Sequence, residues 1–211
     1  FDTVIQLAAF SNDPVDDLNA EKFYKPTVEY TLKIAKLCKK LGKRFIFPSS
    51  CSVYGYGTKT FTEKHKPNPL TNYSKNKLEI EKRLLKIADN RFKPIILRLG
   101  TVYGFSSRIR FDVVVNMFSG MAITKNKILL NSNGLSWRPN VHIHDVCRIF
   151  EEMINLNLKT LKNIIVNIGA SKDNVKIIDI AKMFKKKLKK INIEFILHLN
   201  KKKSLNLFLD K

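Results

Sequence analysis

The sequence has few of the features that mark membrane or exported proteins. No apolar run approaches the ~20 residues that a helix needs to cross a bilayer, and the opening FDTVIQLAAF has no basic n-region of a signal peptide. Cysteine is scarce too: Cys38, Cys51 and Cys147 are widely spaced and odd in number. They fit neither a disulfide framework nor a zinc pattern. We therefore expect a cytoplasmic chain with no membrane partner and no metal.

Acidic residues are also few, 18 against 39 basic ones, which gives a formal net charge of +21. A positive charge of this size suggests nucleic acid or an anionic membrane as a binding partner. However, the excess is mostly lysine, spread along the chain apart from a dense stretch at 182–190, and it is not interleaved with aromatic residues. This pattern favours a solvated lysine-rich surface. We expect no nucleic acid partner, and a basic nucleic-acid binder stays as a competing hypothesis.

Apolar strands and amphipathic helices alternate in the first half. Strands are predicted at Thr3–Leu7, Arg44–Pro48 and Pro94–Leu99, and helices at 16–41 and Tyr73–Asp89. This order, without hairpin signals, is typical of a parallel sheet built from βαβ units. The second half is less regular. The elements predicted there are helix 111–122, strands Ile128–Leu130 and Asn140–Ile143, helix 145–156, strand Asn163–Ile168 and helix 176–190.

Tyr73 and Lys77 are spaced to lie on one face of a predicted helix. An adjacent ammonium stabilises a phenolate, so such a pair can make tyrosine a general base. In so lysine-rich a chain, a pair at this spacing is also expected by chance. The context comes from Ser50, in a serine-rich loop that follows the strand Arg44–Pro48. The carboxyl edge of a parallel sheet is where ligands bind, although a serine cluster after a strand is more often a loop or a cap.

Five motifs occur in order and at suitable spacing: Leu-Ala-Ala after a strand, Ser-Ser-x-Ser-Val-Tyr-Gly, Tyr-x-x-x-Lys, Leu-Arg-x-x-x-Val-Tyr-Gly and Trp-Arg-Pro-x-Val-His-x-x-Asp. Together they resemble the extended short-chain dehydrogenases/reductases, the NAD(P)-dependent nucleotide-sugar epimerases and dehydratases. The resemblance covers the chain from Phe1 to about Asp179. It implies an α/β fold with an NAD(P)-binding, Rossmann-like parallel sheet and a small α/β substrate-binding lobe. We assign 1–105 to the dinucleotide-binding domain and 106–211 to a mixed segment with the substrate lobe and the last Rossmann elements.

The resemblance also implies catalytic roles. Ser50 would hydrogen-bond the reacting sugar hydroxyl, Tyr73 would take its proton as hydride moves to the nicotinamide, and Lys77 would hold the nicotinamide ribose and depress the pKa of the tyrosine. The remaining positions that the resemblance places beside the cofactor are Leu7, Ala8, Ala9, Thr27 and Ser49. Those that it places near the substrate are Ser52, Thr101, Asn116 and Arg138. Arg138 would bind the nucleotide diphosphate, a bidentate task suited to guanidinium, whereas Asn116 also fits a plain helix-face position.

Several positions depart from the family pattern. Thr27 and Thr101 stand where the family commonly has asparagine, and Gln6 replaces a frequent histidine. Cys51 and Ser52 occupy the places of the acidic pair that dehydratases use to eliminate water. The last departure argues for epimerase or reductase chemistry over dehydration. The leading hypothesis is a 4-epimerase-like enzyme that uses NAD, and the enzyme class stays isomerase or lyase. An NADPH-dependent keto-sugar reductase and a catalytically inactive fragment stay open. Cys51 as a nucleophile, and His142 with His144 as a metal pair, are weaker alternatives.

The glycine-rich turn that holds a dinucleotide's pyrophosphate at a helix N-terminus is missing from the sequence. None of the eight glycines forms a G-x-G-x-x-G motif. The family pattern therefore predicts a fragment in which roughly 60 residues, about two βα units, are absent before Phe1. We expect such a fragment to bind NAD poorly. The resemblance further implies a nucleotide-sugar substrate and, for the complete protein, a homodimer through the helices at 16–41 and 73–89.

Overall fold

The computed structural model describes residues 1–9, 20–57, 60–158, 161 and 164–196. Contacts divide the chain into two compact units. The first comprises Phe1–Gly100 and Cys147–Ile168, and the second comprises Thr101–Val146 and Gly169–Lys211. The chain therefore leaves the first unit after Gly100 and returns to it within one helix.

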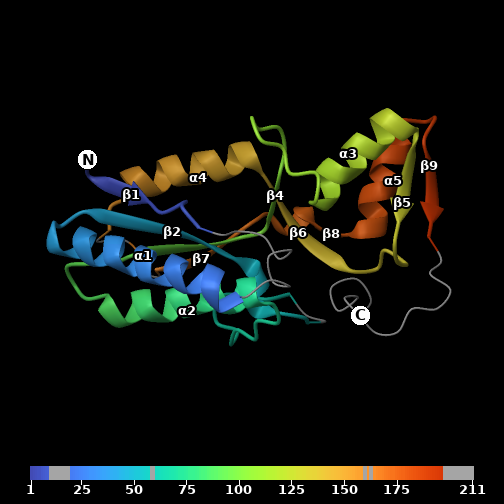
Figure 1. Cartoon of the computed structure of the whole chain (residues 1–211). Coiled ribbons are helices and arrows are strands. Elements are labelled where there is room, and N and C mark those ends of the chain that lie inside the picture. The colour runs from blue at the N-terminus through green and yellow to red at the C-terminus, as the bar shows by residue number, and fades with distance from the viewer. Residues whose placement is uncertain (10–19, 58–59, 159–160, 162–163, 197–211) are drawn as a thin grey trace. The chain divides into compact units, whose positions relative to one another are not determined.

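A parallel sheet forms the centre of the first unit (Figure 1). Its described strands are β1 (Thr3–Ile5), β2 (Arg44–Ser50), β3 (Ile95–Leu99) and β7 (Ile165–Ile168), in the order β1-β2-β3-β7. Every neighbouring pair is parallel. The predicted α/β class with a parallel sheet is confirmed. Because all four strands run the same way, their carboxyl ends share one edge, where β2 ends at Ser50.

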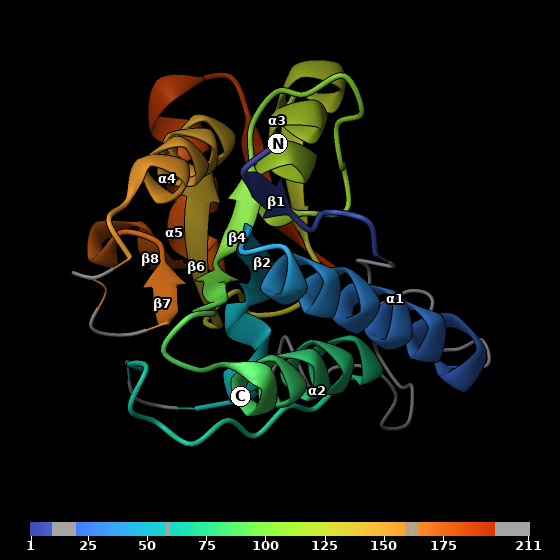
Figure 2. The same ribbon diagram turned by 90° about the vertical axis from the view of Figure 1, so that its left-hand side faces the viewer.

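Helices cover both faces of this sheet. α1 (Ala20–Lys40) and α2 (Asn72–Ile87) lie on one face, and the part of α4 (Ile143–Asn155) that belongs to the first unit lies on the other (Figures 1 and 2). Alternate residues of β2 face opposite sides: Phe45 and Phe47 pack with Ala35 of α1 and Leu84 of α2 in one apolar cluster. This burial fixes which face of α2 meets the sheet, because only one side of the helix is apolar.

A polar cap begins α2 at the edge where β2 ends. The Thr71 hydroxyl accepts a hydrogen bond from the Ser74 amide, and the Ser74 hydroxyl receives one from the Thr71 amide in return. Such a reciprocal cap satisfies two backbone donors that the first helical turn leaves open. It places Tyr73 within the first turn of the helix.

The second unit combines short strands with two helices. β4 (Thr101–Tyr103), β6 (Trp137–His142) and β8 (Asn174–Lys176) form one sheet, and β5 (Lys127–Leu130) pairs with β9 (Asn192–Phe195). α3 (Val114–Lys125) and α5 (Ile177–Lys187) pack on β5 and share an apolar cluster with it. Two one-turn 3-10 helices complete the described elements, η2 (Cys51–Tyr54) in the first unit and η3 (Ser171–Asp173) in the second.

Three short strands, β4, β8 and β9, have no counterpart among the predicted elements. Each has only three or four residues, too few to show the alternation that marks a strand. The start of the predicted helix 16–41 lies partly outside the described residues. Across the residues that are described, no helix has both the length and the apolar character that a membrane crossing requires.

Candidate functional site

Lys77 is the most unusual side chain of the first unit, because it is an ammonium-bearing residue with only 6% of its surface exposed. Its Nζ donates a hydrogen bond to the Pro48 carbonyl of β2 at 2.9 Å. The Nζ also lies 4.8 Å from the centre of the Phe47 ring and 5.7 Å from that of Tyr73. Burial lowers the pKa of Lys77 from 10.5 to about 8, and the Glu81 carboxylate opposes this shift.

Tyr73 lies one helical turn before Lys77 on the same face of α2. Its side chain is half-buried, so the phenol is held by the protein and still borders the solvent. The structure therefore brings the two residues of the predicted pair together. A cation over a tyrosine ring is favourable by itself, and an ammonium beside a phenol favours the phenolate form.

Ser50 ends β2 and begins the η2 turn. Its Oγ accepts hydrogen bonds from the Ser52 amide at 3.2 Å and from the Ser52 hydroxyl at 2.9 Å. A hydroxyl that accepts two bonds still has its own proton to donate. α2 contacts both β2 and η2, so Ser50, Tyr73 and Lys77 lie on adjoining elements at one edge of the sheet.

A buried polar network lies beside Lys77, and the sequence did not reveal it. Arg98 of β3 donates to both carboxylate oxygens of Glu81, with Nη2 to Oε2 at 2.6 Å and Nε to Oε1 at 3.1 Å. Its Nη1 donates to the Tyr54 hydroxyl at 2.8 Å, which donates to the Asn167 side chain at 2.8 Å. Glu81 and Arg98 are 1% and 3% exposed. Two signals existed: Glu81 follows Lys77 by one turn, and Arg98 interrupts the apolar run of β3.

Ser49 belongs to this network. Its hydroxyl donates to Glu81 Oε1 at 2.5 Å, and only 3% of the residue is exposed. The resemblance places Ser49 beside the cofactor, and in the structure its hydroxyl is bonded to the Glu81 carboxylate of α2. Cys51 has a comparable environment: its Sγ donates to the Arg98 carbonyl at 3.1 Å, and burial raises the pKa of the thiol to about 12. A thiol that stays protonated at neutral pH is a poor nucleophile, which disfavours that alternative.

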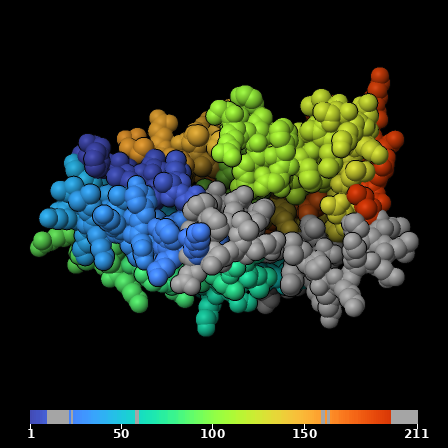
Figure 3. Space-filling view, viewed as in Figure 1, coloured from blue at the N-terminus to red at the C-terminus, as the bar shows by residue number. Residues whose placement is uncertain are grey.

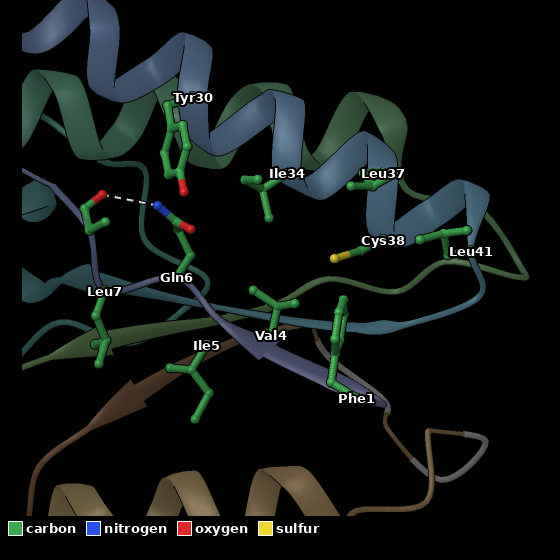
Figure 4. Close-up of a pocket in the computed structure, with 11 residues that line it drawn as sticks. Phe1, Val4, Ile5, Gln6, Leu7, Tyr30, Ile34, Leu37, Cys38 and Leu41 are labelled. Atoms are coloured by element: carbon green, nitrogen blue, oxygen red, sulfur yellow. Dashed lines mark hydrogen bonds between the residues drawn. The ribbon is translucent and has the colours of Figure 1, made fainter.

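The segment after β1 borders an apolar pocket of about 390 Å³ between β1 and α1 (Figure 4). The residues of β1 and α1, in blue, lie side by side at the surface of the first unit (Figure 3). Leu7 and Ala8 line it, with Gln6 between them and the strand, and Leu7 is 66% exposed. The Gln6 side chain donates to the Ala8 carbonyl at 2.9 Å, as the dashed line in Figure 4 shows. Ala9 follows Ala8 in the chain and is half-buried, whereas Thr27 is buried in α1. The pocket is lined by neither Tyr73 nor Lys77.

Three of the predicted substrate residues belong to the second unit. Thr101 is half-buried in β4, opposite Asn140. Asn116 of α3 accepts from the Gly104 amide at 3.0 Å and donates to the Arg110 carbonyl at 3.1 Å. Its amide therefore holds the loop between β4 and α3. Arg138 of β6 donates to the Trp137 carbonyl at 3.0 Å, and burial lowers the pKa of its guanidinium.

The histidines that suggested a metal pair lie next to each other. The rings of His142 and His144 are 4.8 Å apart, edge to face, and Tyr103 packs against His142 at 5.2 Å. Among the side chains that the structure describes, no group of three His, Cys, Asp or Glu residues is placed to hold a metal ion. The His142 ring also fills the space beside Gly104, whose φ of +120° is strained for any residue with a side chain.

A family model described as the NAD dependent epimerase/dehydratase family matches residues 1–169. The chain belongs to this family. The resemblance found in the sequence motifs is thereby confirmed, and so is the Rossmann-like fold class. The family is NAD-dependent by its description, so NAD is the family's cofactor.

Solved structures with the same fold include members that act on nucleotide sugars. One is UDP-glucuronic acid 4-epimerase from Bacillus cereus in complex with UDP-glucuronic acid and NAD, with 25% identity, a TM-score of 0.76, and 92% of this chain and 62% of that chain covered. Another is UDP-N-acetylglucosamine 4-epimerase from Methanobrevibacter ruminantium, with 18% identity, a TM-score of 0.80, and coverage of 92% and 63%. Both share the fold of this chain.

One curated relative is named for a function other than that of the two 4-epimerases. Methionine adenosyltransferase 2 subunit beta from Bos taurus is 25% identical over 150 residues, which covers 71% of this chain and 43% of the relative. The chain thus spans less than half of that relative and under two thirds of the two structures. Family membership alone therefore does not assign a reaction.

Proposed function

We propose that this member of the epimerase/dehydratase family takes part in an NAD-dependent, 4-epimerase-like reaction on a nucleotide-activated sugar, with Tyr73 as the base, Lys77 beside it and Ser50 on the sugar. The observation that carries the proposal is the buried ammonium of Lys77, held by the Pro48 carbonyl one turn from a half-buried Tyr73. A purely structural helix face gains little from a buried lysine, because burial disfavours its charged form.

The residues present fit part of a dinucleotide site. Lys77 has three N–H donors and gives one of them to Pro48, which leaves donors for a ribose. Ala8 and Ala9, together with Leu7, lie where the chain passes the carboxyl end of β1, and the two alanines leave its backbone accessible. NAD, when bound, supplies the hydride acceptor of the reaction. Thr27 and Ser49 complete the proposed cofactor residues, and NADP is the alternative for the reductase reading.

The chain's own residues would handle the proton. Tyr73 Oη removes the proton of the sugar hydroxyl, and the positive charge of Lys77 stabilises the phenolate that accepts it. Ser50 donates its hydroxyl proton to the same sugar oxygen and thereby orients it. After the oxidised sugar has turned, Tyr73 would give the proton back to the same oxygen while the hydride returns from the cofactor to the opposite face of the carbon; the two transfers together would complete an epimerisation. The support for this reaction over dehydration is that Cys51 and Ser52 stand where the dehydratases carry an acidic pair.

For the nucleotide part of the substrate, we propose Arg138, whose guanidinium suits a diphosphate, together with Ser52, Thr101 and Asn116. The similar structure that contains UDP-glucuronic acid supports a nucleotide sugar as the substrate class. The homodimer and the cytoplasmic location also stay proposals. For the dimer, the support is that three large apolar side chains on or directly after α1 are about half exposed, namely Tyr30, Leu37 and Leu41.

The decisive experiment compares the chain with its Tyr73→Phe variant. Interconversion of UDP-sugars is followed by NMR at saturating NAD, with Tyr56→Phe as the control because Tyr56 is 47% exposed and lies outside the site. We expect Tyr73→Phe to lower turnover at least a hundredfold, since general-base catalysis is worth that much, and Tyr56→Phe to leave it unchanged. Equal turnover of Tyr73→Phe and the unmodified chain refutes the proposal. A complete lack of turnover in the unmodified chain supports the inactive alternative instead.

A further inference from the structure

Glu81 continues the row of functional side chains on α2. Tyr73, Lys77 and Glu81 are spaced by four residues each, so they lie above one another on the face of the helix that meets the sheet. Lys77 and Glu81 are both buried, at 6% and 1% exposure. The row therefore passes from a half-exposed phenol through a buried ammonium to a fully buried carboxylate.

The carboxylate of Glu81 is fixed from two strands. Arg98 of β3 binds both of its oxygens, and the Ser49 hydroxyl of β2 binds Oε1. A bidentate guanidinium contact fixes direction as well as distance. Glu81 thus ties α2 to the two central strands one turn beyond Lys77, next to the Pro48 carbonyl that Lys77 itself binds.

A contribution to folding stability does not by itself account for the buried ion pair of Glu81 and Arg98. Replacing a buried ion pair by well-packed apolar residues is often neutral or stabilising, because desolvation of the two charges offsets their attraction. α2 already contributes Ile80 and Leu84 to the core of the first unit. A buried carboxylate at this position is therefore more readily explained by what it does to its neighbours than by what it adds to folding.

The surroundings of Lys77 contain little other charge to keep it protonated. On β2 it faces the Phe47 ring and the Pro48 carbonyl, and on α2 it faces Tyr73 and Glu81. Groups farther into the network are neutral or positive: burial raises the pKa values of Cys51 and Tyr54, and Arg98 is a cation. Among the described residues, Glu81 is the anion that acts on Lys77.

We propose that Glu81, clamped by Arg98 and Ser49, is a positioning residue whose charge keeps Lys77, one helical turn away, in its ammonium form beside Tyr73. The inference rests on the proposed function, because it matters for catalysis only if the Tyr73–Lys77 pair works as described. Without the Glu81 charge, Lys77 is left as a buried cation with Arg98 as its nearest charged neighbour in the network. The loss of the Glu81 anion and the unpaired Arg98 cation that remains both favour the neutral amine of Lys77.

The test is a pH titration of Lys77 by NMR in the whole chain with isotope-labelled lysine Cε, in which Lys77→Arg identifies the resonance. In Glu81→Gln, which keeps the shape of the side chain, we expect the pKa of Lys77 to fall by roughly one unit, the size of a nearby opposite charge. The matched control is Glu79→Gln, which removes an exposed carboxylate of the same helix that pairs with Arg83. It should leave Lys77 unchanged.

A second variant covers the case in which Glu81→Gln does not fold, because that change leaves Arg98 unpaired. The double variant Glu81→Leu with Arg98→Met removes both charges, and the pKa of Lys77 should again fall, but by less than in Glu81→Gln, because the repulsion from Arg98 is lost as well. An unchanged pKa of Lys77 in a variant with a native circular dichroism spectrum overturns the inference, whatever the turnover of Tyr73→Phe. A lowered pKa together with unaffected turnover of Tyr73→Phe supports the charge coupling and overturns the proposed function instead.

Discussion

Replacing the buried Lys77 by methionine should make the chain more stable at neutral pH. Burial lowers the pKa of Lys77 from 10.5 to about 8 in the folded state. A difference of roughly 2.5 units corresponds to about 3 kcal/mol at 1.36 kcal/mol per unit. The hydrogen bond to the Pro48 carbonyl is lost in the variant, which costs about 1 kcal/mol. We therefore expect Lys77→Met to raise the free energy of unfolding by about 2 kcal/mol at pH 7.

The way this stability difference changes with pH follows from proton binding by Lys77. Below pH 8 the lysine is protonated in both the folded and the unfolded state, so the full cost of burying the charge is present. Between about pH 8 and 10.5 the unfolded state binds more protons than the folded state, so the stability of the unmodified chain rises with pH. The advantage of Lys77→Met should therefore shrink across this range and change sign near its upper end, where only the lost hydrogen bond counts.

Urea denaturation at several pH values measures both stabilities, and their difference cancels the titration of the other lysines. Lys75→Met is the matched control, because Lys75 lies on the same helix and is exposed; its difference from the unmodified chain should be within about 0.5 kcal/mol and independent of pH. A Lys77→Met variant that is less stable than the unmodified chain at pH 7, or whose difference from it does not vary with pH, would refute this prediction.

Two further predictions concern the first unit. Arg44→Ala should lower the free energy of unfolding by about 2 kcal/mol, because its guanidinium donates to three carbonyls at the end of α4; in urea denaturation, the exposed Arg83→Ala should cost less than about 0.5 kcal/mol. A thiol reagent at pH 7 should label the exposed Cys147 first and Cys51 only on unfolding, since burial raises the pKa of Cys51 to about 12. Mass spectrometry of a Cys147→Ser variant checks this, and rapid labelling of Cys51 in it would contradict the buried network.

The long elements of the first unit could be predicted because their patterns extend over several turns or a whole strand. The apolar run within Arg44–Pro48 predicted β2, and the amphipathic pattern over Tyr73–Asp89 predicted α2. Strands of three residues such as β4 carry no period, so nothing in the sequence separates them from loops. The edge of the sheet that carries Ser50, Tyr73 and Lys77 followed from the order of the elements rather than from any single residue.

The buried network could not be predicted in the same way. In the sequence, Glu81 is one of several charged residues on α2 and looks like part of its wet face. Whether a glutamate points to solvent or into the core depends on the partner that it meets, and Arg98 comes from a strand that follows a further loop. Only the packing of α2 across β2 and β3 brings the two together. Pairs of this kind are specified by tertiary structure, and their residues have ordinary local patterns.

Lys77 and Glu81 should act on stability in opposite directions, although they lie one turn apart on the same face of α2. Lys77 is a buried cation that the fold holds at a cost, so its removal stabilises the chain. Glu81 offsets part of that cost and satisfies Arg98, so its removal alone leaves two buried cations and destabilises the chain. A residue that costs stability and a second residue that offsets this cost are expected where a charge is kept for chemistry rather than for folding. This contrast is what the proposed catalytic role of this face of α2 predicts, and an ordinary amphipathic helix should not show it.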